Sequence, residues 1–252
     1  MKRILTTLSE KWPEYLLEIL VITIGILGAF ALNNWNENRK EEIVEEKLYR
    51  QLLLDYQANL DQLNQKIALH VTIVNAGQSL LQAYDHPESA HIDSIINNLS
   101  IVGVDPTFDP ITNDLSGSGK INLIENPELN RLLSNWSSDI VALREVQLMW
   151  SRLNYSAFEN RKNELGIGRD VKSVFWEDDT FNKQWILGQR STSNLFLSRS
   201  KRRVDKSVIL NDFHLEGIIS MAILASQASV IQGDELKERI ERIIFLINEE
   251  LE

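Results

Sequence analysis

The stretch of sequence that decides the fold is YLLEILVITIGILGAFALNNW at residues 15–35. From residue 19 to residue 32 it carries no charged side chain. A helix of about twenty apolar residues crosses the roughly 30 Å hydrocarbon core of a bilayer, so this stretch is long enough to span a membrane once. Trp12 and Trp35 lie near its ends, where amphipathic rings favour the headgroup region. We therefore predict a transmembrane anchor at residues 13–35 after a short leader at residues 1–12.

A cleaved signal peptide is the alternative, because Ala29, Phe30 and Ala31 match the small-x-small cleavage pattern. Retention is favoured, since no polar cleavage region follows and the helical pattern continues past Trp35. Lysine and arginine are almost equally frequent on the two sides of the span, but a short basic leader before a first span usually stays inside. We therefore expect a single-pass protein of the cytoplasmic (inner) membrane with a periplasmic body.

Two features of the anchor are candidate contacts. Gly25, Gly28 and Ala29 form a small-residue face that lets another helix approach closely, although small residues are also common in membrane helices without such contacts. Glu18 is an ionisable residue at the edge of the apolar stretch. It is either an interfacial carboxylate that reaches the headgroups or a buried contact with a partner.

Composition limits the class of the body. Hydrophobic residues make up 43% of the 252-residue chain and charged residues 25%, so we expect residues 36–252 to fold as one domain. A net charge of -10 argues against nucleic acid as a partner, because phosphate backbones bind clustered cations. The chain has no cysteine, which excludes disulfides and thiolate metal sites but fits either side of the membrane.

Helical periodicity dominates the body. After the anchor, apolar residues follow alternating steps of four and three, which predicts one long helix over about 36–84 that is continuous with the anchor. The residues of this seam are Tyr49, Leu53, Tyr56, Leu60, Leu63, Ile67, His70 and Val74.

Further helices are predicted from their capping residues. After a short amphipathic helix over 90–102, a linker over about 100–125 contains a helical turn near 111–115. Asn126, Pro127 and Glu128 then predict the start of a helix over 127–165. Two more helices are expected over 207–232 and 234–250, separated by Gly233 and Asp234. No alternating strand pattern competes, so the predicted fold is all-α: a transmembrane helix that continues into an elongated antiparallel helical bundle.

Four stretches of sequence, in the anchor, the middle and the C-terminus, carry a resemblance to a known family. They are EILVITIGIL and ALNNWNENRK at 18–27 and 31–40, LSGSGKINLIENPEL at 115–129, and IIFLINEEL at 243–251. Together they resemble a family of uncharacterised, single-pass, membrane-anchored helical proteins from Bacteroidota, whose domain has no known function. The resemblance implies an anchor and a helical body, with no assigned activity and no catalytic residue to transfer.

Candidate catalytic and cofactor motifs are weak. Gly119 and Lys120 lack the earlier glycine and the following Ser or Thr of a phosphate loop, and His86 and His91 have no standard metal-ligand spacing. His70 is expected at the edge of the helical seam. We therefore predict no enzyme, no catalytic residues, no cofactor and no metal site.

Two clusters remain as candidates for binding. Arg199, Lys201, Arg202 and Arg203 suit an anionic lipid or an acidic partner helix, or simply balance nearby acids as a solvated surface. The aromatic residues Phe175, Trp176, Phe181 and Trp185 are expected to fix an irregular segment to the core, with a binding lip as the alternative.

The expected function is a membrane-anchored helical interaction or scaffold protein without catalytic activity. Its partners are membrane lipid, through one transmembrane helix, and a protein partner or further copies of the chain. The alternative is an extracytoplasmic ligand-binding or sensory bundle that signals through a partner.

Overall fold

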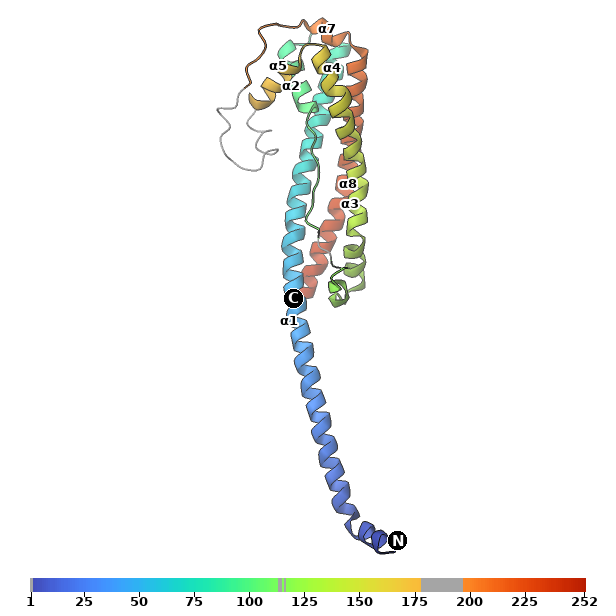
Figure 1. The fold of residues 1–252 in the computed structure, drawn as a ribbon. Coiled ribbons are helices and arrows are strands. Elements are labelled where there is room, and N and C mark those ends of the chain that lie inside the picture. Colours follow the sequence, from blue (N-terminus) through green and yellow to red (C-terminus); the bar gives the residue numbers. More distant parts are fainter. Residues whose placement is uncertain (1, 113–114, 116, 178–196) are drawn as a thin grey trace.

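The computed structural model describes residues 2–112, 115, 117–177 and 197–252, with the backbone alone for residues 2–11, 13–15, 176 and 177. These residues form helices and loops, and no strand occurs among them. Figure 1 shows an elongated molecule in which α1 (Lys2–Asp85) runs the whole length and the other helices pack around its C-terminal half. The predicted all-α fold, with the N-terminal apolar helix continuing into the bundle, is confirmed.

Helix α8 (Phe213–Leu251) lies at the centre of the bundle, because it packs against both α1 and α3 (Pro127–Leu153). It runs antiparallel to both (Figure 1). Helix α3 continues through one turn of π-helix, η2 (Asn154–Phe158), into α4 (Glu159–Glu164). The short helices α2 (Ile92–Val102), α5 (Gly168–Glu177) and α7 (Lys206–Leu210) gather at the end of the molecule where α1 ends (Figure 1).

Because α1 and α3 run in the same direction, the chain between them returns along the bundle as an extended segment (Figure 1). Two side-chain amides hold this return segment. Asn59 on α1 donates to the Ile111 carbonyl at 3.0 Å and accepts from the Ile111 N–H at 2.7 Å, while Gln147 on α3 accepts from the Phe108 N–H at 3.1 Å. An extended segment usually forms its backbone hydrogen bonds with a neighbouring strand, and none occurs among the described residues. The side-chain amides of Asn59 and Gln147 form hydrogen bonds with its backbone groups instead.

The core-facing series of α1 differs from the predicted seam at every second position. The seam residues Leu53, Leu60, Ile67 and Val74 are half-buried, whereas Tyr49, Tyr56 and Leu63 are buried as predicted. The buried residues in the alternate places are Leu52, Asn59 and Ile73. The face is shifted because α1 contacts the return segment and α2 as well as α8. His70 is 3% exposed, so the prediction of a seam-edge position is wrong.

The predicted break at Gly233 and Asp234 is also wrong, since α8 runs through both residues. A Cβ atom at Gly233 would lie 2.8 Å from Cγ1 of Ile67 on α1. At Gly77 on α1, a Cβ atom would lie 2.5 Å from Cγ1 of Ile223 on α8. These two glycines therefore allow α1 and α8 to approach closely, and Gly233 does not end a helix.

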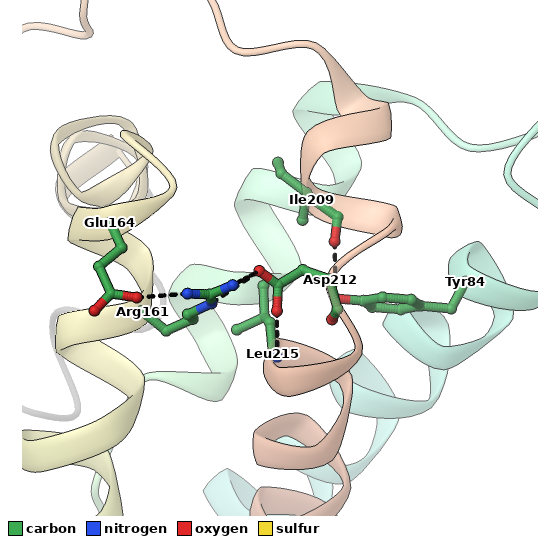
Figure 2. Close-up of polar contacts among 6 residues, drawn as sticks. All are labelled: Tyr84, Arg161, Glu164, Ile209, Asp212 and Leu215. Atoms are coloured by element: carbon green, nitrogen blue, oxygen red, sulfur yellow. Dashed lines mark hydrogen bonds and ion pairs between the residues drawn. The ribbon is translucent and has the colours of Figure 1, made fainter.

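The chain breaks instead just before α8, at a network of polar contacts (Figure 2). Asp212 caps α8 by accepting from the Leu215 N–H at 2.8 Å, and it binds the Arg161 guanidinium of α4, with Nε at 2.8 Å. Tyr84 of α1 donates to the Ile209 carbonyl at 3.1 Å. Burial opposes ionisation of Asp212, but the hydrogen bonds from Arg161 and Leu215 outweigh it and keep the pKa of Asp212 below its usual value. The network joins α1, α4, α7 and α8 at one end of the bundle.

The predicted start and end of the helix over 127–165 agree with the structure, whereas the predicted turn near 111–115 does not. The Asn126 side chain accepts from the N–H groups of Glu128 and Leu129, both at 3.1 Å, at the start of α3. The helix predicted to reach residue 165 ends at Glu164, and Gly166 follows with φ of 73°. The expected turn near 111–115 is not helical at residues 111 and 112, and a 3-10 turn, η1 (Lys120–Leu123), occurs instead. The core stripe of the last helix is buried as predicted: Leu236, Ile240, Ile243 and Ile247.

Candidate functional site

A pocket of about 210 Å³ lies at the end of the bundle farthest from the apolar half of α1, and we call it the distal pocket. It forms where α2 and the start of the return segment meet η2, α4 and α5. One wall is apolar and comprises Val104, Val171 and Phe175. The polar lining residues are Ser100, Asp105, Asn154, Glu159, Lys162 and Lys172.

The π turn η2 shapes this pocket. Asn154, its first residue, donates from Nδ2 to the Gly103 carbonyl at 3.0 Å, and the preceding Trp150 donates from Nε1 to the Val104 carbonyl at 3.2 Å. Both contacts hold the start of the return segment against the helix. A π turn adds one residue to a helical turn, and such turns occur frequently at functional sites.

Three charged side chains form one group in the pocket lining. Lys162 is 2% exposed, donates to Oε1 of Glu159 at 2.6 Å and lies 4.2 Å from the ring centroid of Phe158. Nζ of Lys172 lies 3.2 Å from Oε2 of the same Glu159. Burial lowers the pKa of Lys162, while the contact with Glu159 opposes this shift. Burial also opposes ionisation of Glu159, but the two lysines outweigh it and lower the pKa of that carboxyl.

Two further lining residues, Asn154 and Asp105, have oxygen atoms that can accept additional hydrogen bonds. Asn154 is 3% exposed, and its Oδ1 has no hydrogen-bond partner among the described residues. The amide cannot be turned over without placing Oδ1 against the Gly103 carbonyl oxygen, so this assignment is fixed by the network. Burial raises the pKa of Asp105, and a hydrogen bond with the Ser151 hydroxyl opposes that shift. The pocket therefore offers both cationic donors and acceptors beside an apolar wall.

The predicted contact residues of the anchor all lie on α1. Gly25, Gly28, Ala29 and Glu18 are exposed, and a Cβ atom at Gly25 or Gly28 would meet nothing within 4 Å. Helix α1 is long and apolar enough to cross a membrane, and so is α8 by the same measure. Much of the apolar window of α8 is buried inside the bundle, in agreement with its interpretation as a core helix.

The basic cluster lies at the distal end of the molecule. Arg199 forms an ion pair with Asp93 on α2 at 2.8 Å, and Lys206 donates to the carbonyls of Pro87 and Ala90, just beyond the end of α1. From Trp35 to Asp85, α1 is about 75 Å long at 1.5 Å per residue. The cluster Arg199, Lys201, Arg202 and Arg203 therefore lies far along α1 from the apolar stretch, and its binding to an anionic lipid or an acidic partner helix stays a prediction.

Among the aromatic residues, Phe175 packs half-buried against the core and lines the distal pocket. The Trp176 side chain, Phe181 and Trp185 lie outside the described residues. Sequence reasoning missed Lys162 and Asn154, which sit in polar runs that resemble solvated helix faces. A signal was present, because Trp150, Asn154, Phe158 and Lys162 recur every four residues and continue the buried face of α3.

The fold and the site define an all-α bundle built on an apolar N-terminal helix, with a charged pocket at the opposite end. Comparisons of the chain with protein-family models, with curated proteins and with solved structures found no match. The resemblance carried by residues 18–40, 115–129 and 243–251 therefore stays a prediction.

Proposed function

We propose that this protein is a single-pass protein of the cytoplasmic membrane that binds a small polar molecule in the distal pocket and signals through a partner protein. In this proposal the bundle is periplasmic. The observation that carries it is the pocket itself, where buried Lys162, half-buried Glu159 and the Asn154 Oδ1 that has no partner among the described residues line one cavity. Such convergent polar groups beside an apolar wall are typical of small-molecule sites.

The contacts in the pocket favour binding over catalysis. A serine nucleophile needs a basic partner that removes its proton, whereas the Ser100 hydroxyl donates to the Asn97 carbonyl at 2.7 Å. Lys162 and Lys172 are both paired with Glu159. These groups are arranged to hold a charged or polar molecule in place, so the proposal includes no enzymatic reaction.

A scaffold role is the second candidate, and the anchor supports it. Gly25 and Gly28 present open, exposed backbone on α1, with Ala29 beside them. Small residues let transmembrane helices pack closely without a large apolar interface. A protein partner or a second copy of the chain would then bind along α1. The net charge of -10 disfavours nucleic acid in either role.

Thermal unfolding of the full-length protein in lipid nanodiscs tests the binding proposal. The probes are a mixed panel of amino acids, sugars, nucleosides, dicarboxylates and polyamines, each added alone. At a ligand concentration of about 100 times Kd, linkage predicts a rise in Tm of about 5–10 °C for a domain of this size. Replacing Lys172→Met at the pocket should remove the rise, whereas the matched control Lys201→Met, in the exposed loop before α7, should retain it.

Purification from native membranes in mild detergent separates the two candidates. Loss of a stoichiometric protein partner on Gly25→Ile and Gly28→Ile, together with no Tm response to any probe, would contradict the binding proposal and support the scaffold. A Tm response that depends on Lys172 would support the binding proposal whether or not a partner is recovered.

A further inference from the structure

We infer that the ligand of the distal pocket is a small zwitterion, in which an ammonium group and a carboxylate are attached to one apolar side chain, as in an amino acid. This inference rests on the proposed binding function and specifies its ligand class. It comes from which donors and acceptors of the pocket already have hydrogen-bond or ion-pair partners within the protein.

One side of the pocket has an excess of positive charge. Lys162 and Lys172 together carry two charges and share the single carboxylate of Glu159. An ammonium group has three N–H donors, and the contact with Glu159 uses one of those on Lys162. The side chain of Lys172 is 53% exposed, so its remaining donors are accessible from outside. A ligand carboxylate would balance the charge at this side and accept these donors.

The lining also contains acceptors that no lysine contacts among the described residues. The partner of the Asp105 carboxyl is the Ser151 hydroxyl and not a lysine. The buried Oδ1 of Asn154 has no partner among the residues described, and its orientation is fixed by the bond from Nδ2 to Gly103. A buried acceptor without a donor is destabilising, so a ligand donor would relieve this cost. An ammonium group, with three N–H donors, can donate to acceptors of this kind.

The size and the apolar wall restrict the rest of the ligand. A cavity of about 210 Å³ suits a small molecule, and Val104, Val171 and Phe175 provide an apolar surface for a side chain. Two lysines and two carboxylates give the lining no net charge, which matches a ligand that is neutral overall but charged at both poles. A simple amine or a simple carboxylate would use one pole and leave the other unbalanced.

Calorimetric titration of the full-length protein in nanodiscs tests this class. The probes are valine, leucine and phenylalanine, each compared with its decarboxylated amine and its deaminated acid. We expect at least one of these amino acids to bind, and both of its analogues to bind about tenfold or more weakly, because each lacks one charge-assisted contact.

Two variants test the poles separately. Asp105→Asn should weaken binding of that amino acid about tenfold or more but leave the affinity for its deaminated acid unchanged. Lys172→Gln should also weaken binding of the amino acid about tenfold or more but leave the affinity for its decarboxylated amine unchanged. The controls are Asp109→Asn and Lys201→Gln, which alter exposed residues outside the pocket and should change no affinity.

Equal binding of an amine or an acid would overturn the zwitterion assignment, as would the absence of binding by all three amino acids. The proposed function would still stand if the mixed panel identified another class whose Tm response depends on Lys172. Both the zwitterion assignment and the proposed binding function would be contradicted if no compound of the mixed panel raised Tm and no amino acid or analogue bound in the titrations.

Discussion

His70 is the buried titratable residue at the contact between α1 and α8, where its Nδ1 lies 3.4 Å from the Ser226 hydroxyl oxygen. Burial lowers the pKa of His70 to about 4 from its ordinary 6.5; the Pro106 carbonyl opposes the shift and Lys66 adds to it. Between these two pH values the unfolded chain binds a proton that the folded chain does not. The stability associated with neutral His70 is therefore complete above pH 6.5 and is lost as the pH falls toward 4.

We expect His70→Leu to reduce this pH dependence. As the pH falls from 6.5 to 4, the free energy of unfolding of the unchanged protein should fall relative to that of the variant, by up to about 3 kcal/mol. Urea unfolding at a series of pH values, followed by tryptophan fluorescence, measures the difference. Replacement of the exposed His214 by leucine is the matched control for the substitution itself. Parallel curves for His70→Leu and the unchanged protein would contradict the burial of His70 in neutral form.

At the scale of the helices, Gly77 and Gly217 provide a matched pair. Alanine favours a helix over glycine by about 1 kcal/mol at either position. At Gly77, however, the added methyl group would lie 2.5 Å from Cγ1 of Ile223, whereas at Gly217 it would meet nothing within 4 Å. Overpacking costs about 1–3 kcal/mol. We expect Gly77→Ala to lower the free energy of unfolding by about 1 kcal/mol and Gly217→Ala to raise it by up to about 1 kcal/mol. Urea unfolding measures both, and stabilisation by both variants would contradict the close approach of α1 and α8.

Helices whose limits depend on local chemistry could be predicted from the sequence. The start of α3 at Pro127 follows from its capping residue Asn126, and the end of α4 follows from Gly166. Features set by distant contacts could not be predicted. Gly233 interrupts no helix because it faces Ile67, and Asn59 is buried because it binds a segment fifty-two positions along the chain. The distal pocket was missed for the same reason, since it unites residues from α2, η2, α4 and α5.

At the scale of the whole molecule, the charge at the two ends of the bundle differs. Glu45, Glu125 and Glu250 surround Tyr49 at the end nearest the apolar half of α1, and together with burial they raise the pKa of Tyr49. The basic cluster that begins at Arg199 lies at the opposite end. In a membrane with anionic headgroups, carboxylates at the near end oppose collapse of the bundle onto the surface. For the membrane-anchored protein proposed above, this arrangement would favour a bundle that stands away from the membrane on α1.

The distance between the bundle and the membrane can be measured by fluorescence energy transfer from a donor dye on the protein to an acceptor in the lipid headgroups. Because the natural chain has no cysteine, a single introduced cysteine places the dye at one chosen position. Glu88→Cys labels the distal end and Glu41→Cys the stretch just beyond the anchor, and both positions are exposed. The roughly 75 Å of α1 beyond Trp35 would shorten to about 55 Å even at a tilt of 40°, the upper end of the usual range for transmembrane helices. We therefore expect strong transfer from residue 41 and almost none from residue 88. Comparable transfer from both sites would mean that α1 does not stand as a continuous stalk, and the distal pocket would then lie near the lipid.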